Sequence, residues 1–181
     1  SDTVASLSSV AASGATGKNA GSYTNTVTAG TETNYTVSTV NGGLTIAKAN
    51  ATVTANSGTL TYNGGNQTVS GFTASGLVGG ETASVLSGVS ASRTEKNAGT
   101  YATTASGTDG NYNLSFVDGS MRINKAALTA TGNSTSVTYN GANQTVSGFT
   151  VSGLQGSDTV ASLSSVAASG ATGKNAGSYT N

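Results

Sequence analysis

The most constraining feature of this sequence is an exact internal repeat. Residues 1–25, SDTVASLSSVAASGATGKNAGSYTN, recur without a change at residues 157–181. A weaker repeat lies at half this spacing, since KANATVTANSGTLTYNGGNQTVSGF begins at Lys48 and KAALTATGNSTSVTYNGANQTVSGF begins at Lys125. The repeating unit is therefore about 77 residues. This spacing predicts an array that alternates two related versions of one small domain.

A unit of this length is too long for one turn of a solenoid and long enough for a small domain with its own core. A boundary at the Lys-Ala junctions divides the chain into three copies. Residues 1–47 are then the C-terminal part of one module, 48–124 a complete module and 125–181 the N-terminal part of the next; we call them the upstream, central and downstream copies. A boundary near Ser1 and Gly79 would instead give two whole modules and a 25-residue stub.

Composition excludes several classes of function. The chain has no Cys and no His, which removes zinc fingers, haem ligation by His, thiol catalysis, disulfide scaffolds and His-based triads. Only 8% of the residues are charged, and seven basic residues balance seven acidic ones. The clustered Lys and Arg that a nucleic-acid partner requires are therefore missing from the sequence. The apolar stretches are a few residues long, which predicts no membrane insertion.

Apolar residues alternate with Thr, Ser or Asn along the central copy, which indicates half-buried antiparallel strands. The alternating groups are Ala51 and Val53, then Leu60 and Tyr62, then Tyr112, Leu114 and Phe116, then Met121 and Ile123. Thr suits the outer face of such strands because its branched Cβ fits the pleat and its hydroxyl meets water. The sequence thus predicts an all-β fold of tandem small antiparallel domains, β-sandwich or β-grasp-like, arranged as an elongated rod.

Glycine-containing pairs mark the predicted turns. Asp118-Gly119 and Asn41-Gly42 each lie between two alternating segments, and Asx-Gly is typical of type I′ hairpins because both central residues take positive φ. Residues 62–66, Tyr-Asn-Gly-Gly-Asn, predict a further turn between two strands. Residues 81–86 fit either a strand or a short helical turn, and we expect a strand.

The order of these motifs resembles a known repeat. Asn-Gly after Tyr62, the run SGLVGGETASVLSG at 75–88, Asn-Ala-Gly-Thr-Tyr at 97–101, Asn-Tyr through Asp-Gly at 111–119 and Lys-Ala at 125–126 follow one another over one repeat length. In this order they are similar to the MBG repeat, the mostly-β glycine-rich module of very large bacterial surface and secreted adhesins, including filamentous-haemagglutinin-like proteins exported by two-partner secretion. The resemblance covers the whole chain when the two partial copies are counted. It implies an adhesin shaft or repeat region and supplies no catalytic or ligand residues.

The acidic residues do not form a recognisable site in the sequence. A calcium clamp needs several converging carboxylates. The acids here are well separated along the chain, at Asp2, Glu32, Glu81, Glu95, Asp109, Asp118 and Asp158. Glu81 and Glu95 could supply the paired carboxylates of a glycosidase, but the flanking copies have Ala-Thr-Gly around the position of Glu95. We therefore predict no catalytic, cofactor-binding or metal-ligating residues, no cofactor and no enzyme activity.

Two further motifs have both a functional and a structural interpretation. Asn-x-Ser/Thr sequons are frequent in any chain rich in Asn and Thr, and here they begin at Asn34, Asn50, Asn66, Asn113, Asn133 and Asn143. The repeated Lys-Asn-Ala-Gly-Ser/Thr-Tyr motif ends at Tyr23, Tyr101 and Tyr179. A ring there could stack on a sugar, but we expect a buried ring that anchors a small core, beside solvated lysines at Lys18, Lys96 and Lys174.

Low charge, no Cys and many short polar side chains suit a protein that is exported unfolded and folds outside the cell. We expect a stalk region of a large bacterial extracellular adhesin at the cell surface, which extends a distal adhesive domain for attachment and biofilm formation. Its expected partners are the neighbouring repeat modules. Alternatively, the repeats are weak carbohydrate- or self-binding modules that hold a polysaccharide or a host or bacterial surface by avidity. The partial copies would leave unpaired strand edges, which also predicts head-to-tail self-association.

Overall fold

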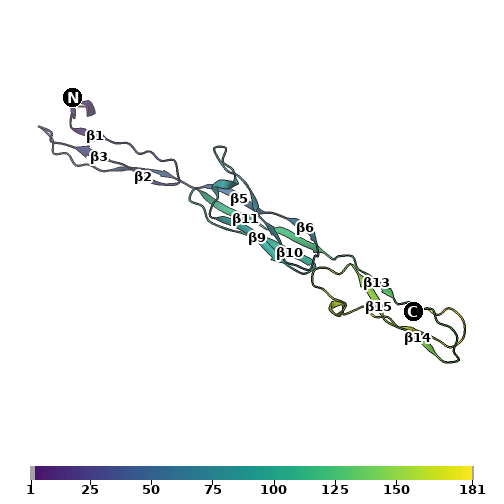
Figure 1. Ribbon diagram of the computed structural model, residues 1–181. Helices are drawn as coiled ribbons and strands as arrows, with labels where there is room; N and C mark the ends of the chain where they lie inside the picture. Colours follow the sequence, from purple (N-terminus) through teal and green to yellow (C-terminus); the bar gives the residue numbers. More distant parts are fainter. Residues whose placement is uncertain (1–2, 181) are drawn as a thin grey trace. The chain divides into compact units, whose positions relative to one another are not determined.

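The computed structural model describes residues 3–180 and confirms the all-β prediction (Figure 1). Within these residues the helical elements are three-residue 3-10 turns, and no helix is long and apolar enough to span a membrane. The chain folds into two compact units, each assembled from several segments. Unit 1 takes its described residues from 3–56, 70–92 and 104–119, and unit 2 from 57–69, 93–103 and 120–180.

Unit 1 contains the elements of the upstream copy and about half of the central copy. Its elements are η1 (Val4–Ser6), β1 (Val10–Ala12), β2 (Gly21–Asn25), β3 (Val27–Ala29), β4 (Gly42–Ile46), β5 (Ala49–Ala55), β8 (Phe72–Ser75), η2 (Ala83–Val85) and β11 (Tyr112–Val117). Unit 2 contains β6 (Gly58–Thr61), β7 (Gln67–Ser70), β12 (Gly119–Asn124), β13 (Thr129–Gly132), β14 (Gln144–Val146), β15 (Phe149–Ser152), η3 (Val160–Ser162) and β16 (Ala171–Gly173). The strands β9 (Val89–Glu95) and β10 (Gly99–Gly107) are divided between the two units, and the end residues Ser70 of β7 and Gly119 of β12 belong to unit 1.

The core of unit 1 forms around β5, whose alternate side chains point inward as the sequence predicts. Ala51, Val53 and Ala55 are at most 4% exposed. In Figure 1, β11 lies beside β5, and the register runs from Tyr112 opposite Ala49 to Val117 opposite Thr54. The other edge of β5 pairs antiparallel with β8. Leu86, which follows η2 and is 1% exposed, and Tyr112 complete this apolar cluster.

The sheets are mixed, whereas the sequence predicted antiparallel strands throughout. β5 and β11 are parallel, and so are β6 and β12. These pairs join segments that are about 63 residues apart, as Tyr112 and Ala49 are. Parallel strands need a long crossover, and here the intervening strands of the same copy supply it. Alternation within a strand is the same for both orientations, so the sequence pattern did not distinguish them.

The prediction of a type I′ hairpin at Asp118-Gly119 is wrong. β11 and β12 lie in different sheets, and within residues 3–180 only glycines have positive φ. Gly119 is required for a different reason, namely close approach of two backbones. A Cβ at this position would lie 2.4 Å from the carbonyl oxygen of Asn56 and 2.5 Å from that of Ala55.

The equivalent hairpin at Asn41-Gly42 is also wrong. β4 pairs with β2, from Gly42 opposite Asn25 to Ile46 opposite Gly21, rather than with the segment before it. The Asn41 side chain instead accepts a 3.0 Å hydrogen bond from the Val27 N–H. The two Asx-Gly pairs lie at equivalent places of the repeat. Asp118-Gly119 carries the chain from one sheet to another, whereas Asn41-Gly42 leads from an irregular segment into β4.

The expected strand at residues 81–86 is a 3-10 turn instead. The Val85 N–H donates to the carbonyl oxygen of Thr82, and the Leu86 N–H donates to that of Ala83, both at 3.1 Å. This tight turn rotates Leu86 into the core. Burial of one leucine side chain stabilises the fold by about 1.5–3 kcal/mol, which outweighs the weak strand preference of the segment.

Unit 2 contains most of the described residues of a five-stranded sheet with the order β6-β12-β10-β9-β7. The turn at residues 62–66 connects β6 to β7, as predicted, but these strands lie at opposite edges of the sheet. Met121 and Ile123 of β12 are 0% and 2% exposed. Thr103 of β10 is also fully buried, and its hydroxyl has no hydrogen-bond partner within residues 3–180.

The partial copies repeat pairings of the central copy. β13 pairs with β15 from Thr129 opposite Ser152, and β5 pairs with β8 from the equivalent Thr52 opposite Ser75. β14 and β16 pair antiparallel, at the places of β7 and β9. In the upstream copy β1 pairs with β3 and β2 with β4. Equal registers at equivalent positions indicate that the downstream copy folds along the same path as the central copy.

Candidate functional site

The most developed polar contact in unit 1 joins Tyr112 to Glu81. Tyr112 is 3% exposed, and its hydroxyl donates a 2.5 Å hydrogen bond to Glu81 Oε2. The same hydroxyl accepts a 3.0 Å bond from the Val78 N–H. Its hydrogen bond to the Glu81 carboxylate raises the pKa of Tyr112, burial adds to the rise, and the bond from the Val78 N–H opposes it. The contact fastens the loop before η2 to strand β11.

A second contact of the same chemistry lies in unit 2. The Tyr62 hydroxyl donates a 2.8 Å hydrogen bond to Asp158 Oδ2, and this bond raises the pKa of Tyr62. Asp158 occupies in the downstream copy the place that Glu81 has in the central copy. Tyr62 belongs to the central copy, so the bond links two copies across the predicted module boundary. We call this bond the junction clamp.

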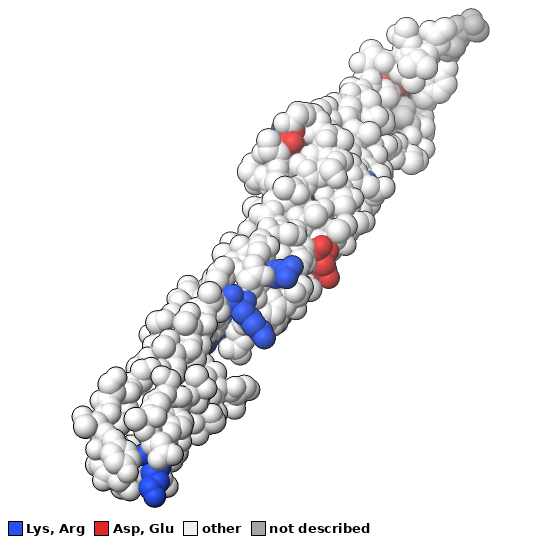
Figure 2. Space-filling view, turned by 90° about the vertical axis from the view of Figure 1, so that its right-hand side faces the viewer, with Lys and Arg blue, Asp and Glu red and all other residues white. Residues whose placement is uncertain are grey.

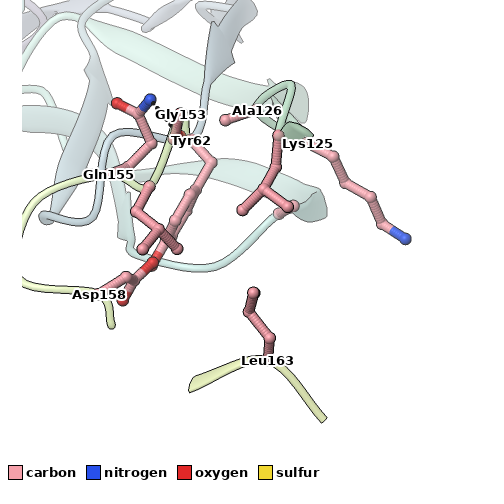
Figure 3. Close-up of a pocket in the computed structure, with 10 residues that line it drawn as sticks. Tyr62, Lys125, Ala126, Gly153, Gln155, Asp158 and Leu163 are labelled. Carbon is pink, nitrogen blue, oxygen red and sulfur yellow. Dashed lines mark hydrogen bonds between the residues drawn. The ribbon is translucent and has the colours of Figure 1, made fainter. Parts of the chain in front are cut away.

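A pocket of about 270 Å³ lies beside the junction clamp. Figure 3 shows the Tyr62 ring directed at Asp158, Leu163 on the far side of the cavity, and the Lys125 side chain extending away from Tyr62. Leu128 and Leu154 also line the pocket. The pocket is thus largely apolar, with one carboxylate at its rim. Its volume is slightly below that of the usual small-molecule site, which is about 300–1,000 Å³.

The turns around the junction clamp meet backbone to backbone. Gly64 has a φ of +78°, and a Cβ there would lie 2.7 Å from the carbonyl oxygen of Gln155. Gly156 has a φ of +58°, and a Cβ there would lie 3.0 Å from the Cα of Gly64. Only glycine combines this left-handed backbone with so close an approach. The Tyr-Asn-Gly turn, predicted only as a connection between strands, therefore also makes the contact with the next copy.

Unit 1 contains a junction between the upstream and central copies. The Ala20 N–H donates a 2.9 Å hydrogen bond to Asn111 Oδ1, and the Asn111 amide donates a 3.3 Å bond to Asn19 Oδ1. Lys48, at the predicted boundary, donates a 2.7 Å bond to the carbonyl oxygen of Asp109. The Lys-Asn-Ala-Gly turn of one copy is thus tied by side chains to the Asn-Tyr motif of the next.

The tyrosines of the Lys-Asn-Ala-Gly motif close their own turns. Tyr23, Tyr101 and Tyr179 donate hydrogen bonds of 2.8–3.0 Å to the carbonyl oxygens of Asn19, Asn97 and Asn175. Tyr23 and Tyr101 are half-buried, and Tyr179 is 49% exposed. The Arg93 guanidinium lies 5.5 Å from the centre of the Tyr101 ring. The prediction that these rings are buried core anchors is therefore wrong, and the buried ring is that of Tyr112.

The remaining acids have local partners. Glu32 accepts hydrogen bonds from the hydroxyl and the N–H of Ser9, at 2.5 and 2.8 Å, and these bonds lower the pKa of Glu32. Asp109 accepts bonds from the N–H groups of Asn111 and Tyr112. Glu95, proposed above as a partner of Glu81, forms an ion pair with Arg93. Asp2 lies outside the described residues. Within residues 3–180 no three acidic side chains form a group that could hold a metal ion.

The sequon asparagines lie on the surface. All six are exposed, which leaves each acceptor accessible. Glycosylation of these positions stays a prediction. Sequence reasoning missed the two tyrosine–carboxylate contacts, although one signal was present. An acid recurs at the equivalent positions Asp2, Glu81 and Asp158, whereas Glu95 does not recur.

These contacts and the fold define a class of protein, namely a tandem array of small all-β modules whose copies are joined by side-chain hydrogen bonds. Residues 51–122 match the family model of the MBG domain (YGX type). This part of the chain is an MBG domain, as the resemblance in the sequence implied. Comparison of the chain with curated proteins and with solved structures gave no match.

Proposed function

We propose that this chain is a section of the stalk of a large bacterial extracellular adhesin. The stalk holds a distal adhesive domain away from the cell surface, for cell-cell or cell-surface attachment and biofilm formation, and it has no enzyme activity. Two findings support the proposal: residues 51–122 are an MBG domain, and the flanking sequence repeats this domain in both directions.

The observation that carries the proposal is the way in which adjacent copies are connected. At one junction Ala20 is bonded to Asn111, and at the other Tyr62 is bonded to Asp158. The connecting segments between copies are only a few residues long, so they provide little flexible linker. Hydrogen bonds between adjacent copies restrict the orientation of each copy relative to the next. A stalk requires this restriction at every junction.

The surface suits a spacer. On the face shown in Figure 2, charged side chains are few, and basic ones lie together near the middle with an acidic one close by; the chain has a formal net charge of zero. Nucleic-acid-binding proteins release counterions through many basic side chains, whereas this chain has seven, balanced by seven acidic ones. We therefore propose neighbouring modules, rather than a nucleic acid or a lipid bilayer, as the partners of each copy.

Small-angle scattering on arrays of two, four and six repeats tests the stalk. A stalk predicts a maximum dimension that increases in proportion to repeat number. An increase with about the square root of repeat number, as for a freely jointed chain, would contradict it. Arrays with Tyr62→Phe in each equivalent position provide the comparison, since the variant removes the junction clamp and leaves the ring in place.

A second candidate function is weak binding by the repeats themselves. The repeated motif places a half-buried tyrosine at Tyr23 and Tyr101, and the uncovered part of an aromatic ring can stack on a sugar. Binding of a polysaccharide by many such copies would act by avidity. This candidate predicts that the apparent affinity for a bacterial-surface or matrix polysaccharide rises with repeat number and falls on Tyr101→Ala. The same affinity for one repeat and for a long array would exclude it.

A further inference from the structure

Strand β11 lies at the edge of its sheet. The sheet has the order β11-β5-β8, so β11 has a strand partner on one side only. The strands of the central copy, from β5 to β12, are all present, and residues of the upstream and downstream copies are described on either side of them in the chain. Within residues 3–180 none of these segments adds a strand to the outer edge of β11. The open edge therefore belongs to a complete copy.

The hydrogen bonds to β5 identify the backbone groups of β11 that face outward. The Ala49 N–H donates a 2.9 Å bond to the carbonyl oxygen of Asn111. In a parallel pair the backbone groups of alternate residues bond to the partner strand. With the register of β11 on β5, this bond shows that the odd-numbered residues of β11 face β5. The N–H and C=O groups of Leu114 and Phe116 therefore point away from β5, toward the open edge.

The outward N–H of Tyr112 is not part of this open edge. It donates a 3.1 Å hydrogen bond to Asp109 Oδ1. A strand that adds to β11 can therefore use the outward groups of Leu114 and Phe116, but it finds the N–H of Tyr112 already bonded. This contact limits the registers in which a further strand can pair with β11.

The sequence of β11 does not protect its edge. The strand Tyr112–Val117, YNLSFV, contains no charged residue and no Pro, whereas natural edge strands usually have Lys, Pro or a bulge that prevents pairing with other chains. Phe116 is 39% exposed and Val117 is 48% exposed. An uncharged and partly apolar edge of this kind is a template for an added strand.

The charges of the central copy favour a second copy of the chain as the source of that strand. Its residues in unit 1 include three acids and one base, namely Glu81, Asp109, Asp118 and Lys48. Its residues in unit 2 include three bases and one acid, namely Arg93, Lys96, Arg122 and Glu95. Each unit of one chain is therefore complementary in charge to the other unit of a second chain. Charge thus favours two chains that run in opposite directions, because a parallel arrangement would bring like units together.

We propose that β11 of a second copy of this chain adds to the open edge in antiparallel orientation. The two strands are related by a two-fold axis at Ser115, which places Leu114 of each strand opposite Phe116 of the other. The outward N–H and C=O groups of both residues then bond across the pair. A register centred on Leu114 would instead require the N–H of Tyr112, which Asp109 holds. The interface is isologous, since the same surface is used on both chains.

The side chains are compatible with this register. The partly exposed Phe116 ring lies beside Leu114 of the partner strand, and cross-strand pairs of aromatic and aliphatic residues stabilise a sheet. On the other face Ser115 lies opposite Ser115 of the partner, so no like charges meet at the axis. The contact between two single copies is small, and an array that repeats this copy increases the strength of association by avidity.

Disulfide trapping on the full chain tests the register, because the chain contains no Cys. Ser115→Cys places the two introduced cysteines in a non-hydrogen-bonded pair, whose Cα atoms lie about 4.5 Å apart, within reach of a disulfide. Asn113→Cys is the matched control, since Asn113 is also exposed on β11 and the register separates its two copies by about 13 Å. Under mild oxidation we expect Ser115→Cys to form a cross-linked dimer at least about tenfold faster than the control.

Equal rates for the two variants would overturn the proposal. A mixture of Asn113→Cys and Val117→Cys provides a second check, because the register places these two positions opposite each other. Their heterodimer should form about as fast as the Ser115→Cys dimer. A parallel pair of β11 strands, or association through another surface, would not give this pattern and would be recognised by its absence.

A further measurement needs no cysteine, namely the average mass by sedimentation over a range of concentrations. Ser115→Lys places two lysines opposite each other at the two-fold axis, where like charges oppose pairing. Thr73→Lys is the control, since Thr73 is exposed on β8, at the other edge of the same sheet. We expect the mass to rise with concentration for the unaltered chain and for Thr73→Lys, and to rise less for Ser115→Lys. A mass that stays monomeric, or a rise that Ser115→Lys leaves unchanged, would contradict the proposal.

This association differs from the head-to-tail association predicted from the sequence, because it uses a complete copy and pairs two chains side by side. It does not rest on the stalk proposal, whose junctions lie within one chain. Failure of the cross-linking test would therefore leave the scattering test of the stalk unaffected.

Discussion

Tyr62 and Asp158 are 96 residues apart in the sequence, and the Tyr62 hydroxyl donates a 2.8 Å hydrogen bond to the Asp158 carboxylate. The same chemistry joins Tyr112 to Glu81, which occupies the position of Asp158 in the central copy. One acidic position of the repeat is thus contacted by a tyrosine of its own copy at one place and by a tyrosine of the preceding copy at another. This position therefore contributes both to folding of a copy and to the connection between copies.

The junction clamp should contribute to stability. We expect Tyr62→Phe to lower the midpoint of thermal unfolding of unit 2, because the variant removes the hydrogen bond to Asp158 and keeps the ring. Tyr139→Phe is the matched control, since Tyr139 is the equivalent residue of the downstream copy and is 61% exposed. Calorimetry of the three chains makes the comparison, and equal midpoints for Tyr62→Phe and Tyr139→Phe would contradict the role given to the clamp.

Alkaline pH should weaken both tyrosine–carboxylate contacts. The pKa values of Tyr62 and Tyr112 are raised in the fold by their hydrogen bonds to carboxylates. Their contribution is therefore complete below the unfolded tyrosine value of about 10 and is lost as pH rises through the folded values. Denaturant unfolding at pH values on either side of this point, with the double variant Tyr62→Phe/Tyr112→Phe as control, measures the effect. A pH dependence that is unchanged in the double variant would refute the assignment.

Acid pH should weaken the upstream copy through Glu32. The hydrogen bonds from Ser9 lower the pKa of Glu32 below the usual value of 4.5. The stabilisation is thus present above the unfolded pKa and is lost as pH falls through the folded pKa. Glu32→Gln should therefore destabilise the β1–β3 pair at neutral pH and have less effect in acid. Hydrogen exchange of the β1 and β3 amides in the two proteins gives the comparison.

The buried Thr103 hydroxyl should cost stability. It has no hydrogen-bond partner within residues 3–180 and the residue is fully buried. Thr103→Val keeps the shape and removes the unsatisfied hydroxyl, so we expect stabilisation of about 1 kcal/mol. Thr104→Val, at the adjacent exposed position, is the control and should stay within about 0.5 kcal/mol of the unaltered chain. Destabilisation by Thr103→Val in denaturant unfolding would show that the hydroxyl has a partner.

Gly119 should not tolerate a side chain. Gly119→Ala would place a Cβ within 2.5 Å of two carbonyl oxygens, and we expect a loss of about 1–3 kcal/mol from the forced backbone shift. Gly110→Ala provides the control because nothing lies within 4 Å of the added Cβ there. The free energy of unfolding of Gly119→Ala should therefore be lower than that of Gly110→Ala by most of this expected loss. Equal values would contradict the close approach of β12 to the end of β5.

Sequence predicted individual strands well because alternation is a local property. Ala51, Val53, Met121 and Ile123 are buried as their pattern indicates. Strand partners were not predicted, because β5 pairs with β11 across most of a repeat and alternation does not encode distance or direction. The hairpin predictions at the two Asx-Gly pairs were wrong for a related reason. Gly119 is needed for contact with Asn56, a residue that no local turn rule includes.

The contacts of the candidate site were harder to predict from the sequence than the strands were. Glu81 and Asp158 were weighed as calcium or catalytic acids, and both are hydrogen-bonded to tyrosines. Their partners lie on other strands, so spacing along the chain did not connect them. The rings of the repeated motif, Tyr23, Tyr101 and Tyr179, were expected to be buried and are not, whereas Tyr112, which strand alternation placed on an apolar face, is 3% exposed. A motif can recur because it shapes a turn, and the Tyr101 hydroxyl does this by bonding to Asn97.

The most direct test of the central claim is the distance distribution across one junction. Spin labels on cysteines introduced at Thr100, in the central copy, and Val160, in the downstream copy, report on the junction clamp by pulsed dipolar spectroscopy, and both positions are exposed and lie in unit 2. A junction tied by Tyr62 and Asp158 predicts a single narrow distribution that broadens on Tyr62→Phe. A broad distribution in the unaltered background would show that the copies are flexibly linked and would contradict the stalk.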